Sequence, residues 1–360
     1  MILEKTIDLL TDIRDDAQQQ EEAKPGIESY CNHIHFVLQR YGNDAEIDKV
    51  IISNAYWLDL ALVCLMFRLV KYRWEKQVTN IDFVFWKDRF EDNLYKWYEP
   101  SSQLLSRIRE WVSSYSTDEQ ALQTFVLTAE KASSLKEMRG SLGEFYTPLP
   151  VANHLAKNLV KSDWSGNPIK IVDQAVGIGS LLGAVTSILI KEALANKVNA
   201  SQIMCQLNRG LYGFDVQPAA VLLARLRLTL EILSVLSQLD GGIPQPLFPN
   251  LSLLDPLVEP ETYWETTGQF CSVIANPPFA RLNRNKVSFL EKYEDVLYGH
   301  ANFYHLFVWW AVQATKPGGK IVFLLPQSFR SGLYGHRLHK HLADKCDLEG
   351  ITMFTNRTGV

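Results

Sequence analysis

The first third of the chain has the spacing of apolar residues that is typical of amphipathic helices. Apolar residues recur three and four positions apart, which places them on one face of a helix. Four stretches have this pattern: residues 6–18, 47–74, 90–98 and 104–115. Turn-forming clusters separate the stretches at Lys24–Gly26, Tyr41–Asp44 and Glu99–Ser102. The pattern predicts a mostly helical N-terminal domain over residues 1–138.

Beyond residue 138 short apolar runs replace this pattern. Residues 169–172, 210–214 and 271–275 are runs of this kind. Their length suits strands that are buried on both faces of a parallel sheet, and helical patterns follow the first two. Residues 139–360 are therefore predicted to form an α/β domain. In such a domain ligands bind at the carboxyl ends of the strands.

Composition narrows the class of protein. The 360 residues are 47% apolar, enough for one large or two ordinary domains. The formal net charge is −4, so a nucleic-acid partner would need a local basic surface. Five cysteines without a C-x-x-C pair favour a reducing cytoplasm. The N-terminus lacks the organisation of a signal peptide, and the apolar stretch Leu60–Phe67 is too short to span a membrane, so no membrane role is expected.

The tetrapeptide Asn276-Pro277-Pro278-Phe279 directly follows the run at residues 271–275. It therefore lies where a ligand is expected. The prolines have no N–H, so the Asn276 oxygen and the backbone carbonyls form a rim of acceptors that suits an amino group. Phe279 supplies a flat face for stacking a nucleobase. The alternative is a proline turn with Phe279 in the core.

A second candidate site combines a glycine loop with two acids. Asp173 ends the first run and precedes Gly177 and Gly179, which permit positive φ and close approach of a ligand. Asp215 ends the next run and can accept both hydroxyls of a ribose. The third glycine of the dinucleotide fingerprint is missing and the acid comes late, so another nucleoside cofactor is favoured. The alternative is that Asp215 caps the helix near Pro218.

In this order the segments resemble DNA adenine-N6 methyltransferases that depend on S-adenosylmethionine, the N-6 DNA methylases of restriction-modification systems. Six segments carry the resemblance: Gly143–Pro148, Asp173–Gly179, Asp215, Leu253–Pro256, Asn276–Phe279 and Lys316–Pro326. The resemblance implies a Rossmann-like methyltransferase fold for residues 139–360. Two positions depart from the family pattern, because Gln174 stands where Pro is frequent and Ile178 where a small residue is common.

The resemblance also implies roles for individual residues. The catalytic residues would be Asn276, Pro277, Pro278 and Phe279. The residues that bind S-adenosylmethionine would be Phe145, Tyr146, Thr147, Pro148, Asp173, Ala175, Gly177, Gly179, Asp215, Asp255 and Asn276. Acceptors at Asn276 and Pro277 would hold the amino hydrogens of a flipped-out adenine, so that the nitrogen lone pair points at the methyl group. No metal is needed for this chemistry.

The resemblance implies double-stranded DNA as the partner, and the helical domain over residues 1–138 would contact DNA or a partner and support the catalytic domain. Arg281, Arg284, Lys286 and Arg330 are candidates to contact its phosphates, which would give binding that weakens with salt. A second basic group at residues 336–345 is equally well explained as a solvated helix face. Its histidines His336, His339 and His341 do not share one helix face, which argues against a metal site.

The resemblance predicts a terminal strand hairpin after Leu348–Phe354 and then a domain that recognises DNA sequence. We expect a catalytic core from which this hairpin is missing and whose recognition region is missing or is supplied by another polypeptide, with sequence-specificity and nuclease subunits as possible partners. Two alternatives remain open. One is a methyltransferase acting on RNA or on a protein glutamine, and the other is a catalytically weak structural subunit that retains the fold.

Overall fold

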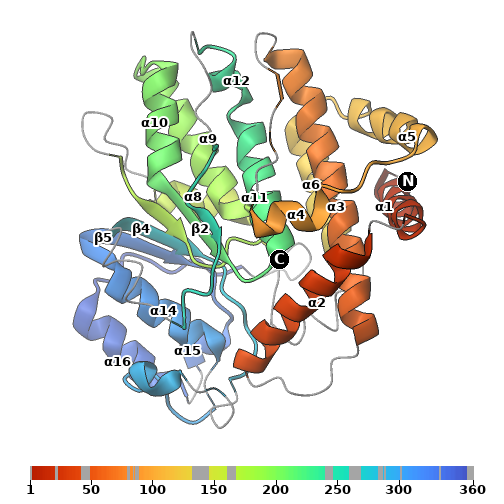
Figure 1. Ribbon diagram of the computed structural model, residues 1–360. Coiled ribbons are helices and arrows are strands. Elements are labelled where there is room, and N and C mark those ends of the chain that lie inside the picture. The colour runs from red at the N-terminus through yellow and green to blue at the C-terminus, as the bar shows by residue number, and fades with distance from the viewer. Residues whose placement is uncertain are drawn as a thin grey trace.

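Figure 1 shows a computed structural model of the chain, in which helices cover both faces of a central sheet and an N-terminal group of helices packs beside it. The residues that the structure describes are 2–20, 23–41, 49–78, 82–83, 85, 89–131, 146–159, 168–239, 246–258, 269–282, 287, 289–300, 302–331 and 334–354.

The sheet contains five strands, all parallel to their neighbours. They are β1 (Ile171–Asp173), β2 (Leu211–Asp215), β3 (Leu251–Leu253), β4 (Phe270–Ala275) and β5 (Thr315–Phe323). Their spatial order is β3-β2-β1-β4-β5. The chain therefore moves outward from β1 to β3 and then returns to the other side of β1. This reversal creates a switch point between β1 and β4, where parallel α/β sheets bind ligands.

Successive side chains along a strand point to opposite faces of the sheet, so each face packs against its own hydrophobic core. Ile171 and Ile274 belong to one core, and Val172 and Val273 to the other. The first core lies under four helices: α8 (Leu149–Leu159), α9 (Ser180–Ala195), α10 (Ala200–Gly210) and α11 (Pro218–Glu231). The second lies under α14 (Phe303–Ala314) and α16 (His336–Lys345). Burial on both faces explains the unbroken apolar runs, and the α/β prediction is confirmed.

Shorter elements complete this part of the chain. They are α12 (Leu233–Leu236), η2 (Leu290–Tyr293) and α15 (Ser328–Ser331). The resemblance through Lys316–Pro326 implies a turn at Lys316–Lys320, but this segment is part of β5, with Gly318 at φ 74° and a register shift in the pairing of β5 with β4. Residues 346–354 belong to no helix or strand, and Leu348 and Ile351 are exposed there. The hairpin predicted beyond them lies outside the described residues.

The N-terminal part is helical, as predicted. Its elements are α1 (Ile2–Gln18), α2 (Ala23–Arg40), α3 (Lys49–Gln77), α4 (Phe90–Tyr95), α5 (Ser102–Ser113) and α6 (Asp118–Lys131). The break predicted at Lys24–Gly26 is wrong, because α2 begins at Ala23 and Pro25 occupies its first turn. A proline is tolerated there since that N–H has no partner within the helix. The proposed boundary at residue 138 lies outside the described residues.

Helix α3 is the centre of the N-terminal part. It packs against α1, α2 and α5 and also against α11 of the α/β part. Its 29 residues are long and apolar enough to cross a membrane by length and composition, so the sequence-based estimate from Leu60–Phe67 was too short. Most of this helix is buried in the protein, with residues such as Leu62 and Leu65 fully enclosed. Packing within the protein therefore accounts for its apolar character.

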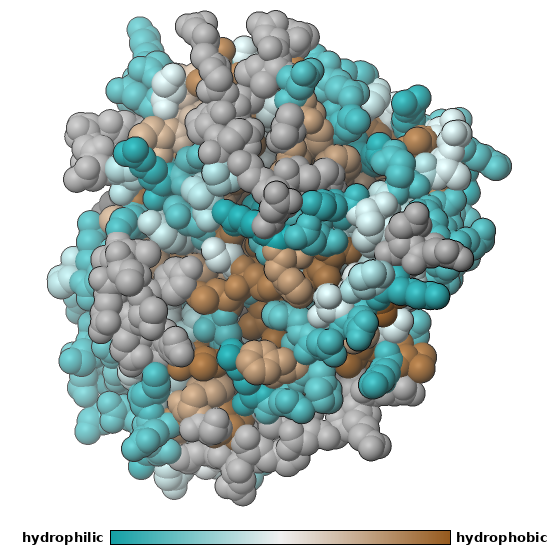
Figure 2. Space-filling view, in the orientation of Figure 1, coloured by the Kyte–Doolittle hydropathy of each residue, from teal (hydrophilic) through white to brown (hydrophobic). Residues whose placement is uncertain are grey.

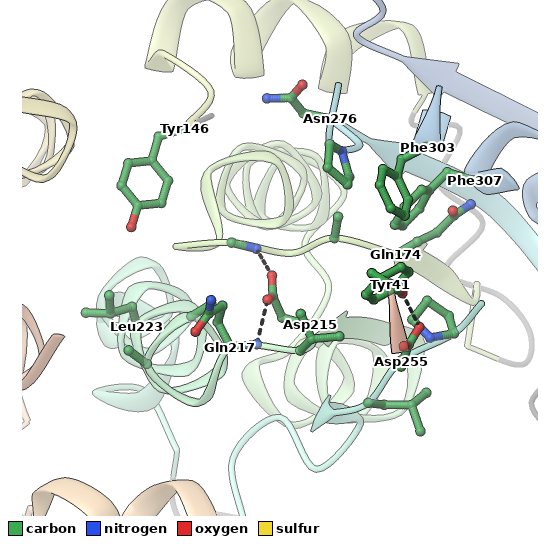
Figure 3. Close-up of a pocket in the computed structure, with 18 of the residues that line it drawn as sticks. Tyr41, Tyr146, Gln174, Asp215, Gln217, Leu223, Asp255, Asn276, Phe303 and Phe307 are labelled. Atoms are coloured by element: carbon green, nitrogen blue, oxygen red, sulfur yellow. Dashed lines mark hydrogen bonds between the residues drawn. The ribbon is translucent and has the colours of Figure 1, made fainter. Parts of the chain in front are cut away.

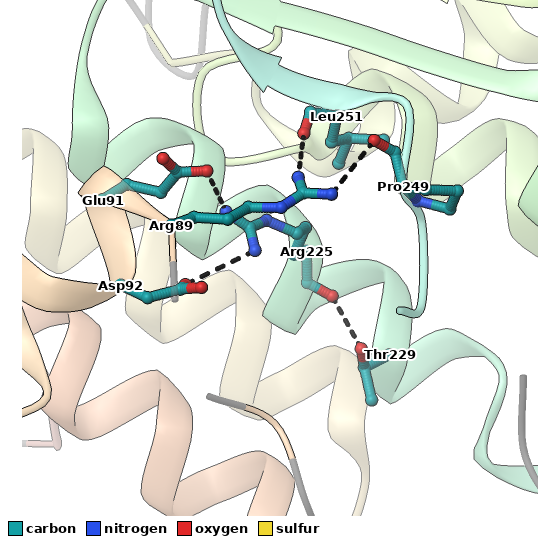
Figure 4. A network of polar contacts seen from close by, with 7 residues as sticks. All are labelled: Arg89, Glu91, Asp92, Arg225, Thr229, Pro249 and Leu251. Atoms are coloured by element: carbon teal, nitrogen blue, oxygen red, sulfur yellow. Dashed lines mark hydrogen bonds and ion pairs between the residues drawn. The ribbon is translucent and has the colours of Figure 1, made fainter. Parts of the chain in front are cut away.

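A buried ion network joins the two parts of the chain (Figure 4). Arg225 of α11 donates hydrogen bonds to Glu91 and Asp92 of α4, and all three side chains are almost fully shielded from solvent. The neighbouring Arg89 donates to the backbone carbonyls of Leu251 and Pro249 beside β3. The orientation of α4 is thus tied both to α11 and to β3, and these two elements lead into the candidate site.

Candidate functional site

A pocket lies at the carboxyl edge of the sheet, at the switch point (Figure 3). Figure 2 shows apolar side chains gathered in the middle of one face between polar margins. The loops after β1, β2, β3 and β4 all reach the pocket, and the N-terminal helices add two residues. Its lining consists of Tyr41, Asp59, Tyr146, Gln174, Ala175, Gly177, Asp215, Val216, Gln217, Ala219, Ala220, Leu223, Leu254, Asp255, Pro256, Asn276, Pro278, Phe303 and Phe307.

The glycine loop after β1 requires its glycines. Gly177 has φ 51° and Gly179 has φ 78°, values that other residues rarely adopt. A Cβ on Gly179 would lie 2.9 Å from the Cα of Ala224, so this glycine also permits close packing of α9 against α11. Gly177 lines the pocket, whereas Gly179 does not. The loop therefore brings backbone to the ligand at one glycine and packs two helices at the other.

Asp215 is fixed at the pocket wall by two backbone donors. The N–H of Gly177 donates to Oδ2 and the N–H of Gln217 donates to Oδ1, each at 2.9 Å. Gln217 is the N-cap residue of α11 and makes no side-chain cap. Asp215 thus accepts a hydrogen bond from the N-cap residue and is not itself the cap of the helix that begins at Pro218. The carboxylate keeps lone pairs that can accept ligand hydroxyls.

Asp173 lies behind the loop and does not line the pocket. Its Oδ1 accepts a hydrogen bond from the Ala175 N–H at 3.1 Å. Burial, with a smaller contribution from the charge of Asp215, raises the pKa of Asp173 to about 8. Burial also raises the pKa of Asp215 above its ordinary value. Asp173 therefore shapes the loop from within and does not contact the pocket directly.

Asp255 forms the far end of the pocket. Its Oδ1 accepts hydrogen bonds from the Tyr41 hydroxyl at 2.8 Å and from the Leu257 N–H at 3.1 Å. Its Oδ2 is shielded from solvent and has no hydrogen-bond partner among the described residues. The rings of Phe303 and Phe307 line the same end. The result is a flat apolar slot with one carboxylate oxygen available to a donor.

The tetrapeptide after β4 borders the same pocket. Asn276 and Pro278 line it, Pro277 is buried behind them, and Phe279 is half-buried outside the lining. The Asn276 side-chain amide donates to the Thr147 hydroxyl at 3.1 Å. This bond directs the nitrogen toward the segment before α8. The side-chain oxygen is the group that the predicted chemistry requires.

The segment before α8 contributes Tyr146 to the pocket lining, while Thr147 is buried and Pro148 is half-buried. The backbone carbonyl of Pro148 accepts from Ala152 at the start of α8. Phe145 lies outside the described residues. The structure therefore brings Tyr146 to the same cavity as Asn276 and Asp215, although they are far apart in sequence.

The predicted DNA contacts form no cluster that the structure describes. Arg281 and Arg330 are exposed, and Arg281 pairs with Asn302 in an isolated antiparallel bridge. Arg284 and Lys286 lie outside the described residues. Within the described ranges, no group of three His, Cys, Asp or Glu side chains is arranged to hold a metal.

Sequence reasoning missed several polar residues of the pocket. Gln174 and Gln217 are buried there, and neither amide has a hydrogen-bond partner within the described part of the chain. In the sequence, Gln174 stands out only as a departure from the family pattern. Gln217 lies two positions after the candidate ligand Asp215, which is the signal that could have found it. Tyr41 comes from the helical part and carried no signal in the sequence. Buried unpaired polar groups in a pocket indicate a polar ligand.

The geometry of the pocket defines a class of protein. It combines a parallel sheet, a glycine loop after β1, an acid after β2 and an acid beyond β3 in one pocket, an arrangement typical of α/β folds that bind nucleotides, and the loop after β4 borders the same pocket. The sequence profile of the family described as Eco57I restriction-modification methylase matches residues 209–360. This match covers Asp215, Asp255 and the tetrapeptide.

Known proteins agree with this assignment. The Type II methyltransferase M.BsuBI of Bacillus subtilis is 26% identical over 242 residues, which are 66% of this chain and 44% of the relative. The DrdV–DNA complex matches with a TM-score of 0.61 and 14% identity over 96% of this chain and 36% of that one. The DNA-bound Type ISP restriction-modification enzyme LlaBIII matches with a TM-score of 0.59 and 13% identity over 95% and 26%. The chain therefore spans less than half the length of each.

The fold is thus shared with DrdV and LlaBIII, and the resemblance to restriction-modification methylases is confirmed in sequence.

Proposed function

We propose that the chain is a DNA methyltransferase that transfers the methyl group of S-adenosylmethionine to the N6 amine of a flipped-out adenine. The observation that carries the proposal is that Asn276 lines the same pocket as Asp215 and Asp255. A methyl acceptor held by the tetrapeptide would thus reach the cofactor end nearest Asn276. Membership of a restriction-modification system follows from the relatives and remains part of this proposal.

The residues of the pocket fit the cofactor. Asp215 would accept the ribose hydroxyls, and Asp255 would accept a hydrogen from the adenine amine. The apolar walls at Leu254 and Phe303 suit the faces of a purine. The unpartnered amides of Gln174 and Gln217 give further polar contacts. Tyr146, close to the glycine loop, would cover the methionine end. These assignments explain why several polar groups of the free chain are buried without partners.

S-adenosylmethionine supplies a sulfonium whose methyl group is ready to leave. The chain itself has to position the acceptor and exclude water. The Asn276 oxygen and the Pro277 carbonyl would accept the two amino hydrogens of adenine and favour a pyramidal nitrogen. In the transfer, the amine would gain the methyl group as the bond between methyl and sulfur breaks, and one amino hydrogen would leave as a proton, so that the products would be a neutral thioether and a methylated amine.

Phe279 would provide the surface on which the flipped base stacks. It lies beside the pocket and is half-buried, so part of its ring is accessible to a ligand. Extruding a base from a duplex costs a few kcal/mol, and stacking on an aromatic ring returns roughly 1–3 kcal/mol. Double-stranded DNA would be the substrate, with specificity and nuclease functions supplied by other regions or subunits. DNA is present in the structures of DrdV and LlaBIII.

The test is methyl transfer from labelled S-adenosylmethionine to DNA, with the methylated nucleoside identified by mass spectrometry. Where a recognition partner is needed, the complex is used. We expect N6-methyladenine, a large loss of product with Asn276→Ala, and little change in the affinity for S-adenosylhomocysteine. Ser252→Ala, a half-buried position on β3 outside the pocket lining, is the control. Methylation of RNA or of a protein glutamine instead of DNA would overturn the substrate assignment.

A further inference from the structure

The N-terminal part of the chain reaches the cofactor pocket at two positions of one segment. Tyr41 directly follows α2, and its hydroxyl donates to Asp255 at 2.8 Å (Figure 3). His33, within α2, places Nε2 at 2.8 Å from the carbonyl oxygen of Val216. Val216 and Asp255 both line the pocket, and they follow different strands. Helix α2 and the residue that follows it are therefore bonded to two separate walls of the pocket.

Packing fixes the position of the Tyr41 ring. Its ring centroid lies 5.0 Å from that of Phe303 and 5.6 Å from that of Phe289, both in edge-to-face geometry. The Tyr41 side chain is buried, with 8% of its surface exposed. A ring held on two sides cannot turn its hydroxyl away from Asp255 without a rearrangement of neighbouring aromatics. The hydrogen bond is therefore preformed.

The bond determines which oxygen of Asp255 is available. Oδ1 is occupied by the Tyr41 hydroxyl and the Leu257 N–H. Oδ2 is shielded from solvent and has no partner within the described ranges. Burial raises the pKa of Asp255, and the hydrogen bond from Tyr41 acts against that rise by favouring the charged form. Tyr41 thus keeps Asp255 an acceptor and leaves Oδ2 as its free site.

We propose that Tyr41 is a positioning residue through which the helical domain selects the base of the cofactor. Tyr41 holds Asp255 so that Oδ2 accepts a hydrogen from an exocyclic amine, such as that of adenine. A base that bears a carbonyl in place of this amine is disfavoured. This inference rests on the proposed function. The physical reason is that a carboxylate and a carbonyl are both acceptors, so a carbonyl-bearing base would leave both oxygens buried without a donor.

The experiment compares two ligands that differ at this position. Calorimetry on the full chain measures S-adenosylhomocysteine, whose base bears an amine, and S-inosylhomocysteine, whose base bears a carbonyl. We expect the unaltered chain to prefer the adenosyl ligand by at least about a hundredfold. Tyr41→Phe keeps the ring and removes the hydroxyl. It should weaken the adenosyl ligand about tenfold and the inosyl ligand little, so the preference falls about tenfold.

Two further variants separate positioning from general damage. Tyr98→Phe removes a buried hydroxyl that donates to Asp16 inside the helical part, so it is a matched control and should leave the preference unchanged. Asp255→Asn offers an amide donor and should shift the preference toward the inosyl ligand. Adding Tyr41→Phe to Asp255→Asn should then change the preference much less than Tyr41→Phe does alone.

The outcomes distinguish the two proposals. If the unaltered chain binds neither ligand, the proposed function fails and this inference fails with it. If the chain binds S-adenosylhomocysteine but Tyr41→Phe leaves the preference unchanged, only the role of Tyr41 is refuted. Equal weakening of both ligands by Tyr41→Phe would also refute it, because that result indicates loosened packing and not selection of the base.

Discussion

The ion network of Arg225 gives a sharp test of what joins the two parts of the chain. The side chains of Arg225, Glu91 and Asp92 are 4%, 6% and 0% exposed. Burial lowers the pKa of Arg225, and the charges of Asp92 and Glu91 act in the opposite direction. Desolvation of the guanidinium is therefore large and is offset mainly by these two acids. Asp92→Ala leaves a buried positive charge with only one acid beside it.

The expected loss from Asp92→Ala is about 3–5 kcal/mol in the free energy of unfolding, the cost of breaking a buried pair from one side. The comparison variant replaces all three residues with apolar ones of similar size: Arg225→Met, Glu91→Leu and Asp92→Leu. The triple replacement removes the desolvation cost together with the attraction between the charges. Its free energy of unfolding should therefore lie within about 2 kcal/mol of that of the unaltered protein, or above it.

Urea denaturation followed by circular dichroism measures both effects. The control is Asp12→Ala, which breaks an exposed ion pair with Arg107, whose partners are 40% and 47% exposed. Exposed pairs contribute about 0–1 kcal/mol, so this variant should unfold close to the unaltered protein. If Asp92→Ala lowers the free energy of unfolding no more than Asp12→Ala does, the network does not stabilise the contact between the two parts of the chain. If the triple replacement loses as much as Asp92→Ala, packing and not uncompensated charge explains the loss.

Two further predictions concern the acids of the glycine loop. Asp215→Ala should weaken the binding of S-adenosylhomocysteine by roughly 1–3 kcal/mol, because the ligand hydroxyls lose their acceptor. If calorimetry shows the same affinity for the variant and the unaltered chain, Asp215 does not contact the ligand. Asp173→Asn keeps an acceptor for Ala175 but cannot ionise. The raised pKa of Asp173, about 8, contributes stability that is complete below pH 4 and is lost as the pH rises toward 8. The unaltered protein should therefore lose stability relative to Asp173→Asn over that range, and parallel curves of unfolding free energy against pH would contradict this assignment.

The sequence predicted those parts of the fold that local pattern determines. The strands β1, β2 and β4 were found because burial on both faces requires unbroken apolar runs. β3 was not predicted as a strand, since its three residues carry too short a pattern. Helix α2 was not among the predicted stretches, and its first turn was interpreted as a break, because a proline in a first turn cannot be distinguished locally from a helix breaker.

The site was predictable to the same extent. Gly177, Asp215, Asp255, Asn276 and Tyr146 line one pocket, as the ordered motifs required. The roles assigned to them stay predictions. Tyr41 could not be found from the sequence, because its partner is 214 positions away and nothing near it suggests a site. The amides of Gln174 and Gln217 act through three-dimensional enclosure, which no local pattern records.

The pocket lowers the stability of the free chain, so contacts outside the pocket have to stabilise the fold. It holds several polar groups that are shielded from solvent without partners among the described residues, including Asp255 Oδ2 and the amides of Gln174 and Gln217. Each such group costs about 1–3 kcal/mol in the free chain. A ligand that satisfies them binds the folded state alone and stabilises it by mass action. The contacts of α4 and α2 hold the walls in place before the ligand arrives, so less of its binding energy is spent on ordering the site.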